Sequence, residues 1–176
     1  TFTGGNAAFS LKRYEDAIEA YEEVIDVPET DNTTRLDAMF NRAEALRSLG
    51  RVEDAKKAFH DIWVKGGADY EQVLMSIAAL MEDEGKWKEA AVAYEEYAPK
   101  FQAPSRMEEA WLKAAIIRTK ISDITGALRN FEKVTAIQGA LAAEAFHKIG
   151  SIKLSEGDTP GARAAFANGA ESFVSS

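Results

Sequence analysis

The stretch KRYEDAIEAYEEV, residues 12–24, decides the fold because the chain repeats it. Its copies are GRVEDAKKAFHDI at 50–62, GKWKEAAVAYEEY at 85–97, SDITGALRNFEKV at 122–134 and the more divergent GDTPGARAAFANG at 157–169. Each copy has a central alanine, and these alanines follow one another at intervals of 38, 35, 37 and 35 residues: Ala17, Ala55, Ala90, Ala127 and Ala162. A period of this length is typical of stacked helical hairpins, whose surfaces usually serve binding.

Each repeat is expected to contain two helices. Between the first two copies, residues 33–50 carry apolar side chains at steps of three and four, which predicts an amphipathic first helix. A glycine, Gly50, follows this helix and is expected to end it. The same place in the other copies is taken by Gly85, Gly157, Lys12 and Ser122. The turn is short, so the two helices should be antiparallel.

The quoted copies themselves predict the second helices. Four residues after its central alanine, every copy has an aromatic side chain, which we expect to wedge between helices: Tyr21, Phe59, Tyr94, Phe131 and Phe166. The alanine is expected where two helices cross closely, since a larger side chain there would overpack by about 1–3 kcal/mol. In the last copy, Pro160 fits the first turn of a helix and Thr159 is the expected N-cap.

These features resemble the tetratricopeptide repeat. The family also has a small residue in the first helix, and the matching positions here are Gly5, Ala43, Ala78, Ala115 and Gly150. The resemblance implies an all-α fold, a tetratricopeptide-like α-solenoid of about five helix-turn-helix repeats that form a right-handed superhelix. We expect a single solenoid over residues 1–176, with repeats at approximately 1–30 (truncated), 33–66, 70–101, 106–138 and 142–174.

Composition limits the class of protein. The hydrophobic content of 46% excludes disorder, and no apolar run approaches the roughly 18 residues that span a membrane. The net charge of −8 argues against nucleic acid or anionic lipid as the main partner. Cysteine is absent, which excludes disulfides and thiolate metal sites. The chain opens at Thr1 without a leader, so we expect it to be part of a longer protein.

The resemblance places a partner-binding groove on the first helices. Its expected lining combines an apolar track with acidic side chains: Phe9, Asp37, Phe40, Glu44, Met75, Glu82, Asp83, Glu109, Leu112, Ile116 and His147. A protein or peptide segment that is apolar on one side and basic on the other would fit such a groove, and binding should weaken with salt. The alternative is that the apolar groups pack between hairpins and that the acids form an ordinary solvated face.

Catalysis finds no support in the sequence. The two histidines, His60 and His147, are more than two repeats apart and have no second ligand at metal-site spacing, so we predict no enzyme, cofactor or metal. Acid pairs such as Glu95-Glu96 and Glu108-Glu109 are expected to be solvated charge. The lysine, arginine and asparagine clamp of chaperone-binding relatives is also missing. Asn41 falls at one of its asparagine positions, and a register one repeat later supplies only Lys113 as a cation.

The sequence therefore predicts a non-catalytic scaffold that binds a partner segment in its concave groove. Uneven spacers at 26–40 and 97–111 resemble those of bacterial envelope tetratricopeptide proteins. This likeness implies an envelope or motility assembly in the periplasm or at the outer membrane, with the cytoplasm as the alternative. The alternative function is a structural module that self-associates into homo-oligomers through its exposed ends, including the end near Phe173.

Overall fold

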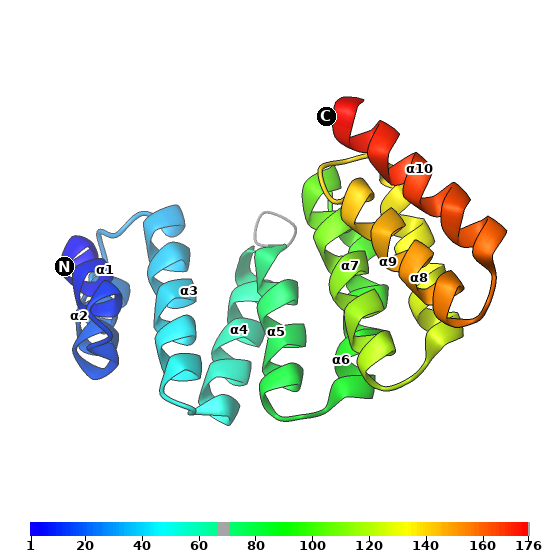
Figure 1. Cartoon of the computed structure of the whole chain (residues 1–176). Coiled ribbons are helices and arrows are strands. Elements are labelled where there is room, and N and C mark those ends of the chain that lie inside the picture. Colours follow the sequence, from blue (N-terminus) through cyan, green and yellow to red (C-terminus); the bar gives the residue numbers. More distant parts are fainter. Residues whose placement is uncertain (67–70, 176) are drawn as a thin grey trace. The chain divides into compact units, whose positions relative to one another are not determined.

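The computed structural model describes the backbone of residues 1–66 and 71–175 and the side chains of these residues up to Ser172 (Figure 1). The described residues form helices and no strands, so the all-α prediction is confirmed. The chain divides into two compact units, Thr1–Glu84 and Gly85–Ser176, which are described separately below. The boundary falls inside the third expected repeat. A single continuous solenoid and its right-handed superhelix remain predictions.

The N-terminal unit consists of alternating first and second helices. Its elements are α1 (Phe2–Ser10), α2 (Tyr14–Asp26), α3 (Asn32–Ser48), α4 (Val52–Gly66) and α5 (Gln72–Asp83). Each helix packs on the next one in the sequence, and α3 lies between α2 and α4. First helices α1, α3 and α5 also contact one another in order, so residues on their outward sides can form one surface.

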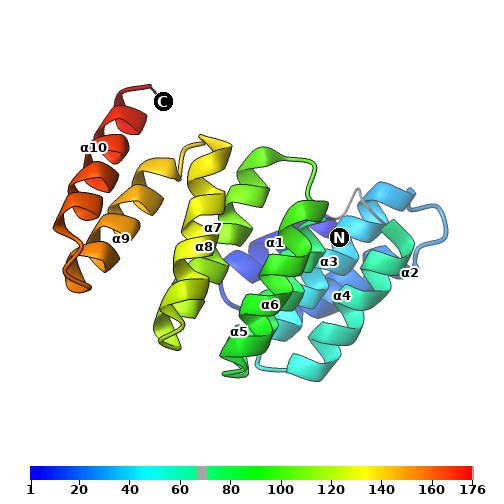
Figure 2. The same cartoon turned by 90° about the vertical axis from the view of Figure 1, so that its right-hand side faces the viewer.

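The C-terminal unit begins with the second helix of the third expected repeat. Its elements are α6 (Trp87–Tyr97), the 3-10 helix η2 (Ala98–Lys100), α7 (Pro104–Lys120), α8 (Ile124–Ile137), α9 (Ala142–Ser155) and α10 (Thr159–Ser175). Helices α7 and α8 form one hairpin and α9 and α10 form the other, which Figure 2 shows side by side. The first helices of this unit are therefore α7 and α9.

The repeat positions that the sequence identified form the core of both units. All five central alanines are buried, as are the aromatic side chains four residues later in the first four copies: Tyr21, Phe59, Tyr94 and Phe131. Phe166 is half-buried. Small residues face these rings, because a Cβ on Gly5 would lie 2.5 Å from Cε1 of Tyr21, and one on Gly150 would lie 2.6 Å from Cε1 of Phe166. These positions therefore require a small residue opposite a large ring.

The turn after each first helix contains a residue in the left-handed backbone region. Gly50, Gly85 and Gly157 have φ values of 74°, 72° and 83°, as expected for glycines that end helices. Lys12 and Ser122 occupy the equivalent turns with φ values of 60° and 62°. Side chains with a Cβ are strained in this region by roughly 1–2 kcal/mol.

Replacing Ser122 by glycine should therefore stabilise the C-terminal unit, by up to about 1 kcal/mol once the greater freedom of glycine in the unfolded chain is included. The matched control is Ser151→Gly in the middle of α9, which should destabilise by about 0.5–1 kcal/mol. Urea denaturation of both variants measures the difference. Equal losses of unfolding free energy in the two variants would show that the turn at Ser122 is not strained.

Aspartates cap two of the second helices. Asp123 accepts a hydrogen bond from the Gly126 N–H at 3.0 Å at the start of α8, and Asp158 accepts one from the Gly161 N–H at 2.9 Å at the start of α10. The expectation that Thr159 caps α10 is therefore wrong, because the helix starts one residue earlier than predicted and the longer side chain of Asp158 reaches the free N–H group.

Candidate functional site

The outward residues of α1, α3 and α5 form what we call the N-terminal face. It consists of Asn6, Phe9, Ser10, Asn41, Glu44, Arg47 and Asp83, together with the buried Ser76 that hydrogen-bonds to Glu44. Its counterpart in the other unit, the C-terminal face, consists of Glu109, Lys113, Ile116 and Lys120 of α7 and Glu144, His147 and Leu154 of α9. Together they contain most of the residues predicted to line a groove.

Hydrogen bonds join the first two helices of the N-terminal face. The hydroxyl of the buried Tyr21 donates to Asn6 Oδ1 at 2.7 Å, and Asn41 Nδ2 donates to the same oxygen at 3.1 Å. Because one oxygen accepts both bonds, the Asn6 carboxamide is held in one orientation. Burial also raises the pKa of Tyr21, so its hydroxyl keeps its proton and remains a donor.

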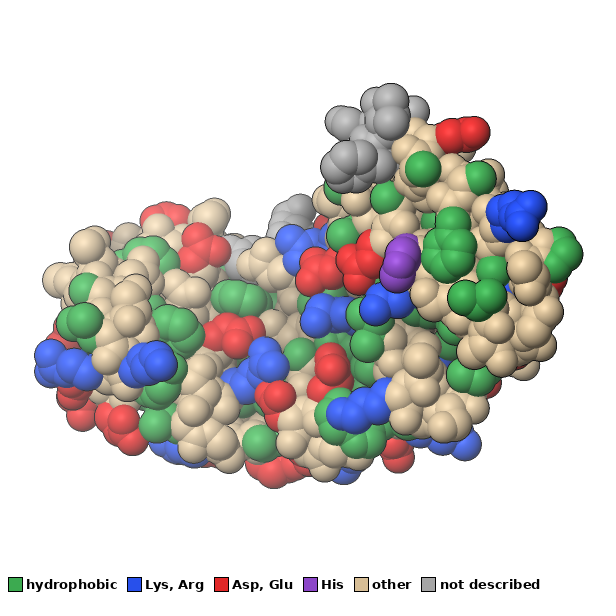
Figure 3. All heavy atoms as spheres, in the orientation of Figure 1, with side chains coloured by type: hydrophobic (Ala, Val, Ile, Leu, Met, Phe, Trp, Pro, Cys, Tyr) green, Lys and Arg blue, Asp and Glu red, His purple; other side chains and the backbone are tan. Residues whose placement is uncertain are grey.

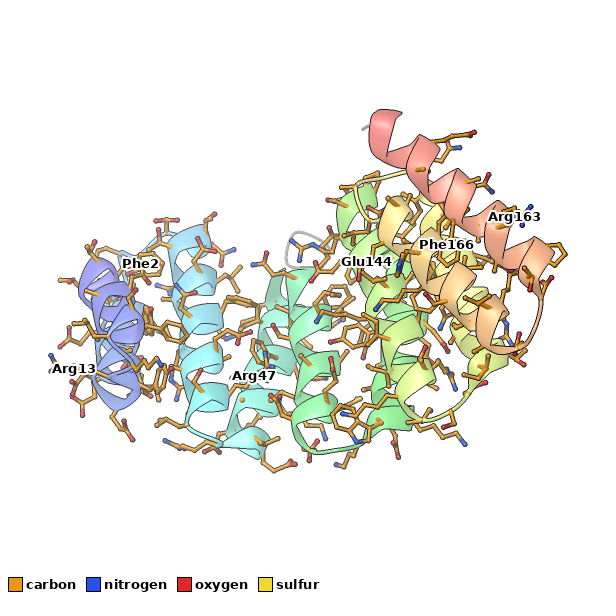
Figure 4. All side chains as sticks on the ribbon, viewed as in Figure 1. Phe2, Arg13, Arg47, Glu144, Arg163 and Phe166 are labelled. Carbon is orange, nitrogen blue, oxygen red and sulfur yellow. The ribbon has the colours of Figure 1, made fainter. Side chains whose placement is uncertain are left out.

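The acidic side chains of this face are largely paired. Ser76 Oγ donates to Glu44 Oε1 at 2.6 Å, while Arg47 lies 2.6 Å from Asp83 and 3.6 Å from Glu44. Figure 4 shows Arg47 on the side of α3 toward α5. Since Arg47 offsets both carboxylates, the predicted attraction of Glu44 and Asp83 for a basic partner is weaker than the sequence suggested.

An open recess lies next to this network. It has a volume of about 320 Å³ and is lined by Asn6, Phe9, Ser10, Tyr21, Asn41 and Glu44. Phe9 forms an apolar wall, and its ring packs edge-on against Tyr14 at 5.3 Å. The recess therefore combines fixed polar groups with an aromatic surface.

Several other predicted groove residues have packing roles. Met75 and Leu112 are buried, and the half-buried Phe40 packs edge-on against Phe59 at 5.6 Å. Their placement favours the alternative in which much of the apolar track packs between hairpins. Asp37 and Glu82 are half-buried on α3 and α5 and make contacts of their own. Among the predicted apolar residues, Ile116 keeps the largest accessible part, 45% of its surface.

The C-terminal face has a different character. Lys120 Nζ lies 3.1 Å from the ring centroid of Trp87, and Lys113 Nζ lies 5.8 Å from that of Tyr94. The exposed His147 packs its ring 5.5 Å from that of Phe166. Figure 3 shows acidic, basic and histidine side chains gathered over α7 and α9, and Figure 4 shows Glu144 on the α7 side of α9.

Charge is divided unevenly along the chain. Residues 1–84 carry 18 Asp and Glu against 9 Lys and Arg, whereas residues 85–176 carry 11 against 12. The N-terminal unit therefore has a net charge of −9 and the C-terminal unit one of +1, which together give the −8 of the chain. A single prediction of a basic partner for the whole groove does not describe the C-terminal unit.

Glu95 belongs to an internal network and is not solvated as predicted. Arg118 donates to its carboxylate at 2.9 and 2.7 Å, and Asn130 donates to it at 2.6 Å. Burial alone would raise the pKa of Glu95, but the hydrogen bonds from Arg118 and Asn130 together lower it. Glu22 stands at the same repeat position and pairs with Arg42, but this pairing is visible only in the structure.

We expect Glu95→Gln to lower the free energy of unfolding at pH 7 by about 1–2 kcal/mol, because Arg118 loses charged hydrogen-bond acceptors. Since the folded pKa lies below the ordinary value of 4.5, the stabilisation from Glu95 is complete above that pH and is lost as pH falls through the folded pKa. The variant and wild type should therefore converge in acid. The exposed neighbour serves as control: Glu96→Gln should show neither effect in denaturation at several pH values.

Glu108 is the other acid for which the solvated prediction is wrong. Only 2% of its surface is exposed, and its Oε1 accepts a hydrogen bond from the Leu141 N–H at 2.9 Å. Burial raises the pKa of Glu108, although backbone N–H groups of Leu141, Gly139 and Ala142 pull it down. The carboxylate thus caps α9 from α7, and a side chain on Gly139 would collide with it.

The described residues offer no support for metal or membrane chemistry. No group of three or more His, Asp or Glu side chains among them could hold a metal ion. None of the described helices has the length and apolar character needed to cross a bilayer. What the two faces present instead are hydrogen-bonding groups, aromatic rings and oriented lysines.

Comparisons with known proteins agree with the repeat architecture. Residues 5–31 and 37–65 each match a family model described as tetratricopeptide repeat. A search of curated proteins gives no significant sequence match. Among solved structures, MamA is 15% identical with a TM-score of 0.69, and the alignment covers 97% of this chain and 95% of MamA.

Two other solved structures have the same fold. BtubC (BKLC) from P. vanneervenii is 16% identical with a TM-score of 0.71, covering 97% of this chain and 77% of that one. A Podosopora anserina kinesin light chain with nearly identical TPR-like repeats is 16% identical with a TM-score of 0.66, covering 98% and 92%. Identities this low establish the shared helical repeat fold and nothing about partners.

Proposed function

We propose that this chain, as a tetratricopeptide-repeat protein, is a non-catalytic scaffold. A segment of a partner protein binds to the N-terminal and C-terminal faces that its first helices form. Stacked helical repeats present extended surfaces for such binding. The proposal rests on the N-terminal face, which three successive first helices form beside an open recess. Contacts between these helices fix Asn6 with Asn41, and Arg47 with Asp83.

Preorganisation is what makes this arrangement suitable for binding. Asn6 and Asn41 are fixed before a partner arrives, so less side-chain entropy is lost on association. Phe9 adds apolar contact in the same recess. A short extended segment can satisfy both kinds of group, with its main chain on the carboxamides and one side chain on the ring.

The test is affinity capture from the source organism with matched variants. Asn41→Arg fills the recess of the N-terminal face and Ile116→Arg alters the C-terminal face, while Lys57→Ala on the exposed side of α4 is the control. We expect at least one face variant to weaken capture of a reproducible partner by about tenfold or more and the control to leave it unchanged. Phe40→Glu is less suitable because Phe40 packs against Phe59. Equal capture by all variants would contradict the proposal.

Self-association through the ends is the second candidate function. Leu11, at the end of α1, exposes 69% of its surface, which leaves a large apolar side chain uncovered at the start of the array. The side chain of Phe173, at the other end, lies outside the described residues. Sedimentation at several concentrations distinguishes the candidates, because Leu11→Glu should abolish a wild-type oligomer only if copies associate through this end.

For location, we propose a bacterial envelope or motility assembly, in the periplasm or at the outer membrane. Support comes from the spacers at 26–40 and 97–111, which resemble those of envelope tetratricopeptide proteins. Fractionation of the source cells tests it. Recovery of the protein with the cytoplasm would favour the alternative.

A further inference from the structure

We propose that the C-terminal face binds an acidic segment with an apolar side chain at its centre, held by Lys113 and Lys120 around Ile116. This inference rests on the proposed scaffold function and gives that function a partner chemistry. The acidic partner proposed here differs from the basic partner that the acidic residues in the sequence led us to expect.

The three residues form one stripe of α7. Lys113, Ile116 and Lys120 are separated by three and four residues, so their side chains leave the same side of the helix. Ile116 is 45% exposed between the two lysines. An apolar side chain of a partner can cover it while carboxylates on either side reach the ammonium groups.

The lysines are positioned but not neutralised. The Trp87 ring supports Lys120 at 3.1 Å and the Tyr94 ring supports Lys113 at 5.8 Å, which limits the motion of both flexible side chains. Within the part of the chain that the structure describes, neither lysine forms an ion pair with a carboxylate. An arriving carboxylate therefore gains attraction without having to displace an internal one.

The acids of the same face limit how the partner lies. Glu109 is exposed in the second turn of α7 and Glu144 in the first turn of α9, whereas Lys120 ends α7. Acidic groups of the partner should therefore follow α7 toward its C-terminal end. Its opposite edge can carry a neutral or basic group near Glu144 and His147.

The described residues of the other unit, 1–66 and 71–84, do not offer an equivalent site. Arg47, the cation of the N-terminal face, is already paired with Asp83 and lies near Glu44. Residues 1–84 also carry twice as many acids as bases, 18 against 9. An acidic segment should accordingly prefer the C-terminal face, since long-range repulsion disfavours the other one.

Two blocked synthetic peptides of twelve residues test the inference on the full chain. They share leucines at every third or fourth position and differ only in having glutamate or lysine elsewhere. Backbone amide shifts of α7 and the indole N–H shift of Trp87 report binding and the movement of Lys120. We expect the acidic peptide to bind about tenfold more tightly than the basic one and to shift both sets of signals.

Matched variants then test whether Lys113 and Lys120 bind the acidic peptide. Replacing both Lys113 and Lys120 by glutamine should lower the affinity for the acidic peptide by about tenfold, whereas Lys133→Gln on the exposed side of α8 should leave it unchanged. Equal binding of the two peptides, or a double variant that binds like the wild type, would overturn the inference. The scaffold proposal would survive that result if face variants still lost their captured partner, so the two failures can be told apart.

Discussion

Phe131→Ala is expected to lower the free energy of unfolding by about 3–5 kcal/mol, because it removes an aromatic side chain from the closed centre of the C-terminal unit. Phe131 is buried and packs in one cluster with Ala127, Val134 and Ile149. Their small or branched side chains cannot expand into the space left by the ring, so a cavity should remain.

Leu154→Ala is the matched control, because Leu154 is 55% exposed on α9 and its loss should change stability by no more than about 0.5 kcal/mol. Hydrogen exchange of α8 amides is the preferred measurement, since repeat units can unfold separately. Similar effects from the two substitutions would show that the aromatic position is not the core of this repeat.

Glu108→Ala should be the second most damaging substitution. It deprives the Leu141 N–H, and its neighbours at the start of α9, of their buried acceptor. Each donor left unpaired costs about 1–3 kcal/mol. Hydrogen exchange at the first turn of α9 should accelerate more than exchange in α8.

Glu108→Gln tests whether the hydrogen-bond acceptor or the charge of Glu108 stabilises the start of α9. Glutamine keeps an acceptor and removes the buried charge, so its cost should be far smaller. The raised pKa means that the contribution of Glu108 to stability is greatest below about pH 4.5 and declines as pH rises through the folded pKa. Glu108→Gln should lack this decline. An equal loss from Ala and Gln would show that the acceptor has no role.

The repeat pattern predicted the fold because each of its positions has one physical requirement. The buried Ala17 and Ala127 mark close helix contacts, and Tyr21 and Phe131 fill the space between helices. The turn at Ser122 was located correctly, although serine is an unusual residue in the left-handed region that it occupies. Such constraints are local to one or two repeats, so a single sequence reveals them.

Site chemistry was less predictable because it depends on pairs of residues from different repeats. Asp83 was predicted as a groove acid, but its neutralisation by Arg47 of α3 appears only when α3 and α5 are packed together. Periodicity likewise cannot distinguish the buried Glu108 from its exposed neighbour Glu109, since the Leu141 N–H that donates to Glu108 lies 33 residues further along the chain. Exposure of Ile116 beside Lys113 and Lys120, which lie over the rings of Tyr94 and Trp87, is also a property of packing.

Site-specific photocrosslinking in the source organism tests the central claim most directly. A photoreactive phenylalanine analogue is placed at Ser10 or Ile116 on the first-helix faces, and at Lys57 or Lys133 on exposed sides of second helices. The account predicts that at least one of the first pair crosslinks to a discrete partner protein and that neither of the second pair does. Crosslinks confined to Lys57 and Lys133 would contradict it.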